Sequence, residues 1–403
     1  MAIATAADRI LELNMDTIQQ GVIALLKSAI AGKSYILPEN FRLEDAAQQI
    51  REHHIAALVY DGAIRCGIDK QSTFMQELFP MYWKALVKSE AQMREVKKVQ
   101  AAFDEQEISY LPLKGCRIKG LYPKPELRPM ADADILIRMD EYDRIVPTMR
   151  ELGFLEGQET DHELVWHSKS LYLELHKRLI PSYNKDFYAY FGEGWQIARV
   201  DCGTRYTMTT EDEMVFLFTH FAKHYRDGGI GCRYVVDLWV FRNAHPNMDE
   251  SYIRSVLRKL YLEEFYDNML RLIDVWFHDA PTDEKIDYMT AFVFGSGSWG
   301  SVESRTLSVT VRDAKHSVLG FSGKLVYAWN TLFPDVATLK GKYTILKKAP
   351  WLLPFIWIIR PFYKVLFEWR TMDKQKRNMD AVSRKNMKQR RKMLNYVGLD
   401  YNF

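Results

Sequence analysis

The chain has 403 residues, of which 47% are hydrophobic and 27% charged, and its formal net charge is +3. This length supports two or three domains with a large core, and no internal repeat or low-complexity segment is evident. The four cysteines form no CxxC pair, which argues against a disulfide framework and a zinc ribbon. The N-terminal residues lack the pattern of a secretory signal, so we expect a cytoplasmic protein.

Residues 1–105 are expected to form a helical N-terminal region. Apolar residues recur at helical spacing from Ile10 to Ile30 and again from Met81 to Phe103. Pro38 and Pro80 are expected to interrupt the helices. We expect this region to pack against the one that follows.

Residues 106–210 alternate between strand and helix patterns. Asp140 and Gly153 predict the start and end of a helix over residues 141–152. The alternation predicts an α+β fold in which helices flank a small mixed sheet. The expected strands cover residues 107–113, 132–138, 163–167 and 171–177, and a short helix is expected over residues 116–122.

Residues 211–300 are expected to form a helical domain. Thr209 and Thr210 precede three acidic residues and an apolar run, which is a strong helix start. His220 and His224 are spaced i, i+4 on this helix, a spacing that can bind zinc. No HExxH pattern or third ligand accompanies them, so packing or substrate contact is the preferred interpretation.

Residues 301–403 form a C-terminal region with an aromatic segment and a basic tail. Residues 340–399 carry a net charge of +13, which leaves −10 for the rest of the chain. The apolar run 351–359 is too short to span a bilayer, but its two tryptophans suit a helix lying on an anionic membrane. Residues 340–403 are therefore a candidate attachment to the inner membrane face. The alternatives are a helix that covers the core, an oligomer contact, or binding of RNA by the basic tail.

The most informative motif is Asp132-Ala133-Asp134, which opens an apolar strand pattern. Carboxylates at i and i+2 on a strand point to the same face and repel each other unless a cation lies between them. Glu174, in a later apolar strand, is the expected third acid, with Glu163 as its competitor. Three acids at one end of a sheet predict a phosphoryl-transfer site with two Mg²⁺ ions, and Mn²⁺ is a second candidate.

The stretch from Leu111 to Arg178 resembles the uncharacterised nucleotidyltransferase family of the DNA polymerase beta-like superfamily. Lys114-Gly115 stands where the wider superfamily has Gly-Gly or Gly-Ser. The matching segments are Leu113-Lys114-Gly115, Leu121-Tyr122-Pro123, Leu127-Arg128-Pro129, Asp132 to Ile137, Leu152-Gly153-Phe154 and Leu173-Glu174-Leu175-His176.

The resemblance implies transfer of a nucleoside monophosphate from a nucleoside triphosphate such as ATP to a hydroxyl. Asp132, Asp134 and Glu174 would be catalytic and would hold the metal. The candidate nucleotide-binding residues are Lys114, Gly115, Arg128 and His176.

The acceptor class stays open at the level of the sequence, and a sugar or glycan precursor is preferred. One alternative is a toxin-like transferase that modifies tRNA or protein. Another is a nucleotide-binding protein that keeps the fold without turnover.

Overall fold

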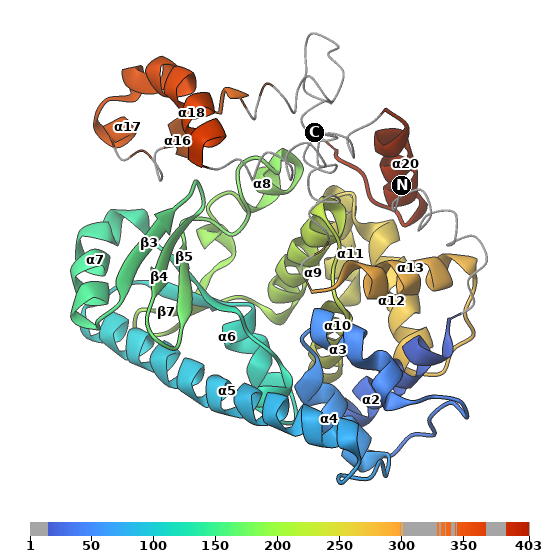
Figure 1. The fold of residues 1–403 in the computed structure, drawn as a ribbon. Coiled ribbons are helices and arrows are strands. Elements are labelled where there is room, and N and C mark those ends of the chain that lie inside the picture. Colours follow the sequence, from blue (N-terminus) through green and yellow to red (C-terminus); the bar gives the residue numbers. More distant parts are fainter. Residues whose placement is uncertain are drawn as a thin grey trace.

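The computed structural model describes residues 15–298, 300, 329, 332–334, 336–339, 343, 345–367 and 384–402. Within them, seven strands form one mixed sheet flanked by many helices (Figure 1), which confirms the predicted α+β fold. The strand order is β3-β4-β5-β2-β1-β7-β6. The strands are β1 (Tyr110–Leu113), β2 (Asp132–Ile137), β3 (Leu155–Glu159), β4 (Glu163–His167), β5 (Tyr172–His176), β6 (Arg199–Cys202) and β7 (Arg205–Thr207).

The two faces of the central strands have different chemistry. Strand β2 pairs antiparallel with β1 and parallel with β5. Because side chains alternate along a strand, one face of β2 and β5 is apolar and the other carries the acids. The apolar face packs against helices α5 (Thr73–Glu105) and α7 (Tyr142–Glu151) in a buried cluster that includes Ile135, Ile137, Leu173 and Leu175. The acidic face is therefore left to build a site.

Helix α5 is longer than the sequence pattern predicts. It runs for 33 residues along the sheet (Figure 1) and continues through Pro80, so the predicted interruption at this residue is wrong. Proline removes one backbone N–H donor from a helix. Tyr82 lies close to the proline, and it bonds Glu126 and stacks on Tyr60 of α4 (Ala56–Arg65). Contacts outside the helix hold this turn in place.

A second, larger core joins the N-terminal helices to the helices that follow the sheet. Leu25 and Leu26 share it with Phe216 and Phe265, although these residues are far apart in the chain. Its helices include α2 (Thr17–Ala31), α4, α9 (Thr210–Asp227), α10 (Cys232–Ala244), α11 (Glu250–Lys259), α12 (Glu263–Phe277) and α13 (Glu284–Ser296).

The last described helix, α20 (Arg384–Tyr396), docks on this same core. Arg390 is buried and donates to the backbone carbonyls of Tyr225 and Arg226 on α9. Leu394 and Tyr401 are buried in the core cluster. Residues 384–402, which include the end of the basic tail, are therefore packed on the body. The part of the tail at residues 368–383 lies outside the described residues.

The aromatic segment forms α18 (Leu353–Phe367), which does not cover the large core. It packs with α16 (Val336–Leu339) and α17 (Ile345–Lys348) in a small cluster of their own, apart from α9 to α13 (Figure 1). None of the helices in the described part of the chain combines the length and the apolar character needed to cross a membrane.

Several predicted elements are confirmed, whereas others need correction. Strand β4 has the predicted bounds, and β2 and β5 agree within a residue at each end. Asp140 is not the helix cap: it lies in a 3₁₀ turn, and the capping position of α7 is Glu141, without a side-chain hydrogen bond. Strands β3, β6 and β7 were not predicted.

Candidate functional site

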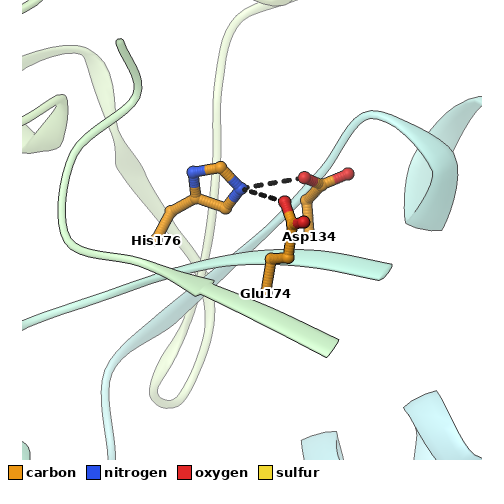
Figure 2. Close-up of side chains that lie close together, drawn as sticks. All are labelled: Asp134, Glu174 and His176. Carbon is orange, nitrogen blue, oxygen red and sulfur yellow. Dashed lines mark hydrogen bonds and ion pairs between the residues drawn. The ribbon is translucent and has the colours of Figure 1, made fainter. Parts of the chain in front are cut away.

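Parallel pairing of β2 with β5 brings the predicted acids together. Asp134 lies opposite Glu174 in the register, and Asp132 lies opposite Tyr172. His176 follows Glu174 by two residues and therefore lies on the same face of β5. Figure 2 shows the Asp134 and Glu174 carboxylates turned toward the His176 ring from neighbouring strands. The non-local contact between the DxD motif and Glu174 that the sequence suggested is present in the fold.

Asp134 is the most strongly bound carboxylate of the site. Its Oδ1 accepts from Lys114 Nζ at 2.7 Å and lies 2.8 Å from His176 Nε2, which is also 3.5 Å from Glu174. Burial alone would raise the pKa of Asp134, but Lys114 and His176 outweigh it and hold that pKa well below its usual value. Asp134 is therefore ionised at neutral pH.

Lys114 and His176 respond in the opposite direction. Burial lowers the pKa of Lys114, but the Asp134 and Glu174 carboxylates outweigh burial, and the net pKa is raised. His176 behaves in the same way: burial and Lys114 lower its pKa, while hydrogen bonds to Asp134 and Glu174 give a net increase. The carboxylates thus stabilise positive charge on both neighbours.

The side chain of Asp132 makes no hydrogen bond or ion pair with the described residues, although the charges of Lys114 and Arg233 act on it from a distance. Burial, Asp134 and Glu174 together raise its pKa to about 6. A bound cation would stabilise the ionised form of Asp132, because it would offset the repulsion from Asp134 and Glu174. Asp132 is thus the acid that the metal-free site destabilises.

The donor set of this face fits a divalent metal. One ligand atom from each of Asp134, Glu174 and His176 lies within 4.8 Å of the others. Carboxylate oxygens are the ligands that Mg²⁺ and Mn²⁺ prefer, and Asp132 adds another at the edge of the same strand. Asp132, Asp134 and Glu174 could hold the metal, with His176 either as a further ligand or as the group that orients Asp134.

Lys114 occupies an unusual backbone conformation. Its φ is +42°, a value that L-residues rarely adopt, at the junction between β1 and helix α6 (Gly115–Ile118). This turn points the ammonium at Asp134. The next residue, Gly115, is closely packed. A Cβ at this position would lie 2.9 Å from both Arg128 Nη1 and Met130 Sδ. A larger residue at this position would have to displace the end of one of these two side chains.

The guanidinium group of Arg128, a candidate nucleotide-binding residue, is bound to Asp237. Its Nε and Nη2 donate to the two carboxylate oxygens of Asp237 at 2.8 and 3.0 Å, and the side chain is buried. Asp237 also accepts from Tyr122 at 2.7 Å and from Arg233 at 2.9 Å. We call Tyr122, Arg128, Arg233 and Asp237 the Asp237 cluster. It joins α10 to the segment before β2, and Arg128 still lines the cavity.

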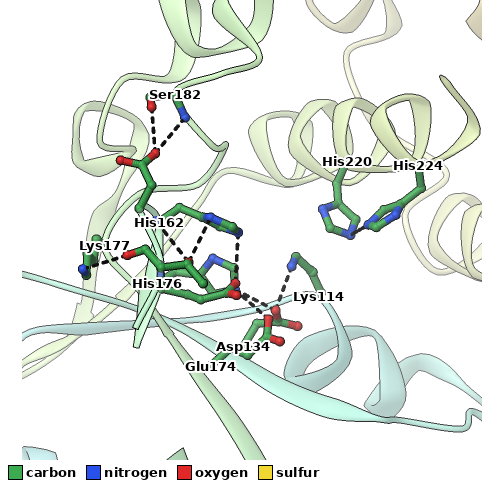
Figure 3. A network of polar contacts seen from close by, with 12 residues as sticks. Lys114, Asp134, His162, Glu174, His176, Lys177, Ser182, His220 and His224 are labelled. Atoms are coloured by element: carbon green, nitrogen blue, oxygen red, sulfur yellow. Dashed lines mark hydrogen bonds and ion pairs between the residues drawn. The ribbon is translucent and has the colours of Figure 1, made fainter. Parts of the chain in front are cut away.

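The acids face a cavity of about 440 Å³ whose opposite wall is helix α9. His220 and His224 of α9 line this wall with their Nε2 atoms 3.0 Å apart, and Figure 3 shows them across from Lys114. Burial and the nearby Lys114 charge lower the pKa of His220 well below its usual value, so this ring is neutral. Among the described residues, the grouping suited to a metal is Asp134, Glu174 and His176, and the histidine pair is not part of it.

Lys223 is the functional candidate that sequence reasoning missed. It lines the cavity and is only 9% exposed, and its ammonium group makes no hydrogen bond or ion pair with any residue in the described part of the chain. Burial lowers its pKa, and Asp227 offsets this only in part. The signal was present in the sequence, because the spacing of His220, Lys223 and His224 puts them on one face of the helix.

Glu163, the competitor of Glu174, lies further from the centre. Its carboxylate pairs with His162 at 3.0 Å, and burial, which would raise its pKa, is outweighed by that neighbour. Both residues line the cavity. Glu163 is opposite His176 on the adjacent strand, so it borders the site without joining the three-residue metal grouping.

Comparison with known proteins gives one match. A family model described as uncharacterised nucleotidyltransferase matches residues 39–278, more than half of the chain. This range contains every site residue described above. Neither the curated proteins nor the solved structures contain a match.

Proposed function

The chain belongs to the uncharacterised nucleotidyltransferase family, and from this premise we propose that it transfers a nucleoside monophosphate from a nucleoside triphosphate to a hydroxyl acceptor. The observation that carries the proposal is the pairing of Asp134 with Glu174 on adjacent strands, with Asp132 beside them at the wall of the cavity. Clustered acids of this kind are the usual means of holding divalent metal for phosphoryl transfer.

The reaction would proceed by direct displacement at the α-phosphate. The acceptor oxygen forms a bond to the α-phosphorus, the bond to the bridging oxygen breaks, and pyrophosphate leaves with the electron pair. In this proposal, Glu174 would accept the hydroxyl proton. Divalent metal, held by Asp132, Asp134 and Glu174, would supply charge neutralisation and a more acidic hydroxyl.

Residues around the acids would position the triphosphate. Lys114 and Lys223 present cationic groups from opposite sides of the cavity, and His176 keeps Asp134 in place. Arg128 and Gly115 shape the wall between them. A ligand with several negative charges would complete the pairing that Lys223 lacks among the described residues.

The acceptor that suits this cavity best is a small molecule that carries hydroxyl groups, such as a sugar or glycan precursor. A cavity of about 440 Å³ is in the range of small-ligand sites. Transfer to tRNA or protein would need only a protruding hydroxyl to enter, and it is the alternative to be tested.

Pyrophosphate release tests the reaction directly. The purified chain is incubated with each labelled triphosphate, Mg²⁺ and, in turn, sugars, nucleosides, tRNA and hydroxyl-bearing peptides. We expect release that requires one acceptor class and is lost with EDTA and in Asp132→Asn/Asp134→Asn. Release that persists in the double variant would contradict the assigned site. Metal-independent nucleotide binding without release would favour a binding protein.

Lys223→Met tests the phosphate contact. We expect the KM for the triphosphate to rise by about tenfold or more, because a charge-assisted contact is lost. Stability without nucleotide should hold or increase, because a buried ammonium without a counter-ion is unfavourable. The matched control is Lys259→Met on the exposed surface of α11. An unchanged KM in Lys223→Met would exclude this lysine from nucleotide binding.

A further inference from the structure

Helix α18 exposes an apolar face that the protein does not use for its own packing. Phe355, Ile358 and Ile359 are spaced i, i+3 and i+4 on the helix, which places them on one side, and Trp351 lies in the 3₁₀ turn just before it. Their exposed fractions are 71%, 58%, 63% and 63%. These four residues fall within nine positions of the chain. A second group of exposed apolar residues at helical spacing, Phe79, Trp83 and Val87 on α5, has lower exposed fractions of 48%, 55% and 53%. A contiguous patch of this kind marks an interaction surface.

The opposite side of the helix is packed against neighbouring residues. Ile356 is buried with Leu339 and Leu346, and Trp357 packs on the same cluster while its Nε1 donates to the Pro334 carbonyl at 2.8 Å. The exposed face is therefore held outward by a small packed unit of α16, α17 and α18 (Figure 1). Its exposure does not follow from poor packing of the helix.

The charge of the sequence around this face indicates which kind of partner would bind it. In the sequence, residues 335–368 contain six lysines and arginines against two acids, Asp335 and Glu368, which stand at the two ends of this range. A second copy of the chain, docked face to face, would bring these like charges together. An anionic lipid surface meets both requirements, because it accepts apolar side chains and attracts the surrounding basic residues. Tryptophan at the edge of such a face is typical of residues at a lipid–water boundary.

We propose that Trp351, Phe355, Ile358 and Ile359 insert into the surface of an anionic bilayer and hold the protein there. The helix lies in the plane of the interface, since the described helices include none able to cross a membrane. This inference does not depend on nucleotidyl transfer. It places the catalytic body at a lipid surface whatever its acceptor.

Vesicle flotation of the full chain tests the proposal. Vesicles of phosphatidylcholine alone are compared with vesicles that also contain phosphatidylglycerol. We expect the protein to float with the anionic vesicles and much less with the neutral ones. In Ile358→Gln/Ile359→Gln, the partition coefficient should fall by about tenfold or more, because the loss of one inserted isoleucine is worth about that factor.

The control carries a similar change, from an exposed aliphatic residue to glutamine, at two positions outside α18. Ile36→Gln/Val200→Gln removes two exposed aliphatic side chains elsewhere and should float as the unmodified protein does. Failure of the unmodified chain to float, or equal loss in both variants, would overturn the proposal. It would also be overturned if the α18 variant converted a dimer to a monomer in sedimentation analysis without any change in flotation.

Discussion

Asp132→Asn is expected to abolish nucleotidyl transfer and at the same time to stabilise the metal-free protein. The loss of activity should reach about a thousandfold, because one of the carboxylates proposed to hold the metal, which would neutralise charge on the phosphates, is gone. The gain in stability follows from the raised pKa. A carboxyl whose pKa moves from 3.8 in the unfolded chain to about 6 in the fold destabilises the fold when it is ionised. At pH 7 the variant should be more stable by about 1–3 kcal/mol.

The pH dependence gives this prediction a definite sign. The penalty from Asp132 is complete above pH 6, shrinks as the pH falls through 6, and disappears below the unfolded value of 3.8. The advantage of Asp132→Asn in EDTA should therefore vanish on acidification over this window. Thermal unfolding from pH 4.5 to 8 would measure it. Asp201→Asn, an exposed aspartate of β6, is the matched control. If Asp132→Asn were less stable than the unmodified protein at pH 7, repulsion between Asp132 and the neighbouring carboxylates would be contradicted.

The local half of the site was accessible from the sequence. Asp132 and Asp134 open an apolar run with two-residue alternation, so their common face follows from strand geometry alone. The position of Glu174 opposite Asp134 depends on the register between strands separated by about forty residues, which a single sequence does not determine. The resemblance to a known family supplied that link.

The elements that escaped prediction have a common physical cause. Strands β3, β6 and β7 lie toward the two edges of the sheet, and most of their residues are exposed or half-buried. They lack the apolar alternation on which strand prediction depends. Lys223 was missed for a related reason: its helix was recognised by its apolar residues, and the polar ones were interpreted only as a histidine pair. The side that faces the cavity becomes visible only when α9 is placed against the sheet.

Removal of the Asp237 carboxylate is expected to lower the free energy of unfolding more than removal of an exposed charged group. In Asp237→Asn, the guanidinium groups of Arg128 and Arg233 both lose their counter-ion, while Arg128 stays buried. Breaking a buried ion pair from one side typically costs about 3–5 kcal/mol, and we expect a loss in this range. Urea unfolding monitored by tryptophan fluorescence would measure it.

The consequence for the site distinguishes a structural from a phosphate-binding Arg128. The Asp237 cluster ties α10 to the chain just before β2, so its loss should loosen the cavity and weaken nucleotide binding along with stability. If Arg128 instead serves mainly as a phosphate ligand, freeing it from Asp237 should tighten nucleotide binding while stability falls. Titration of Asp237→Asn with nucleotide at a temperature where it stays folded separates the two, and Asp267→Asn, at a partly exposed ion pair with Arg254, provides the baseline.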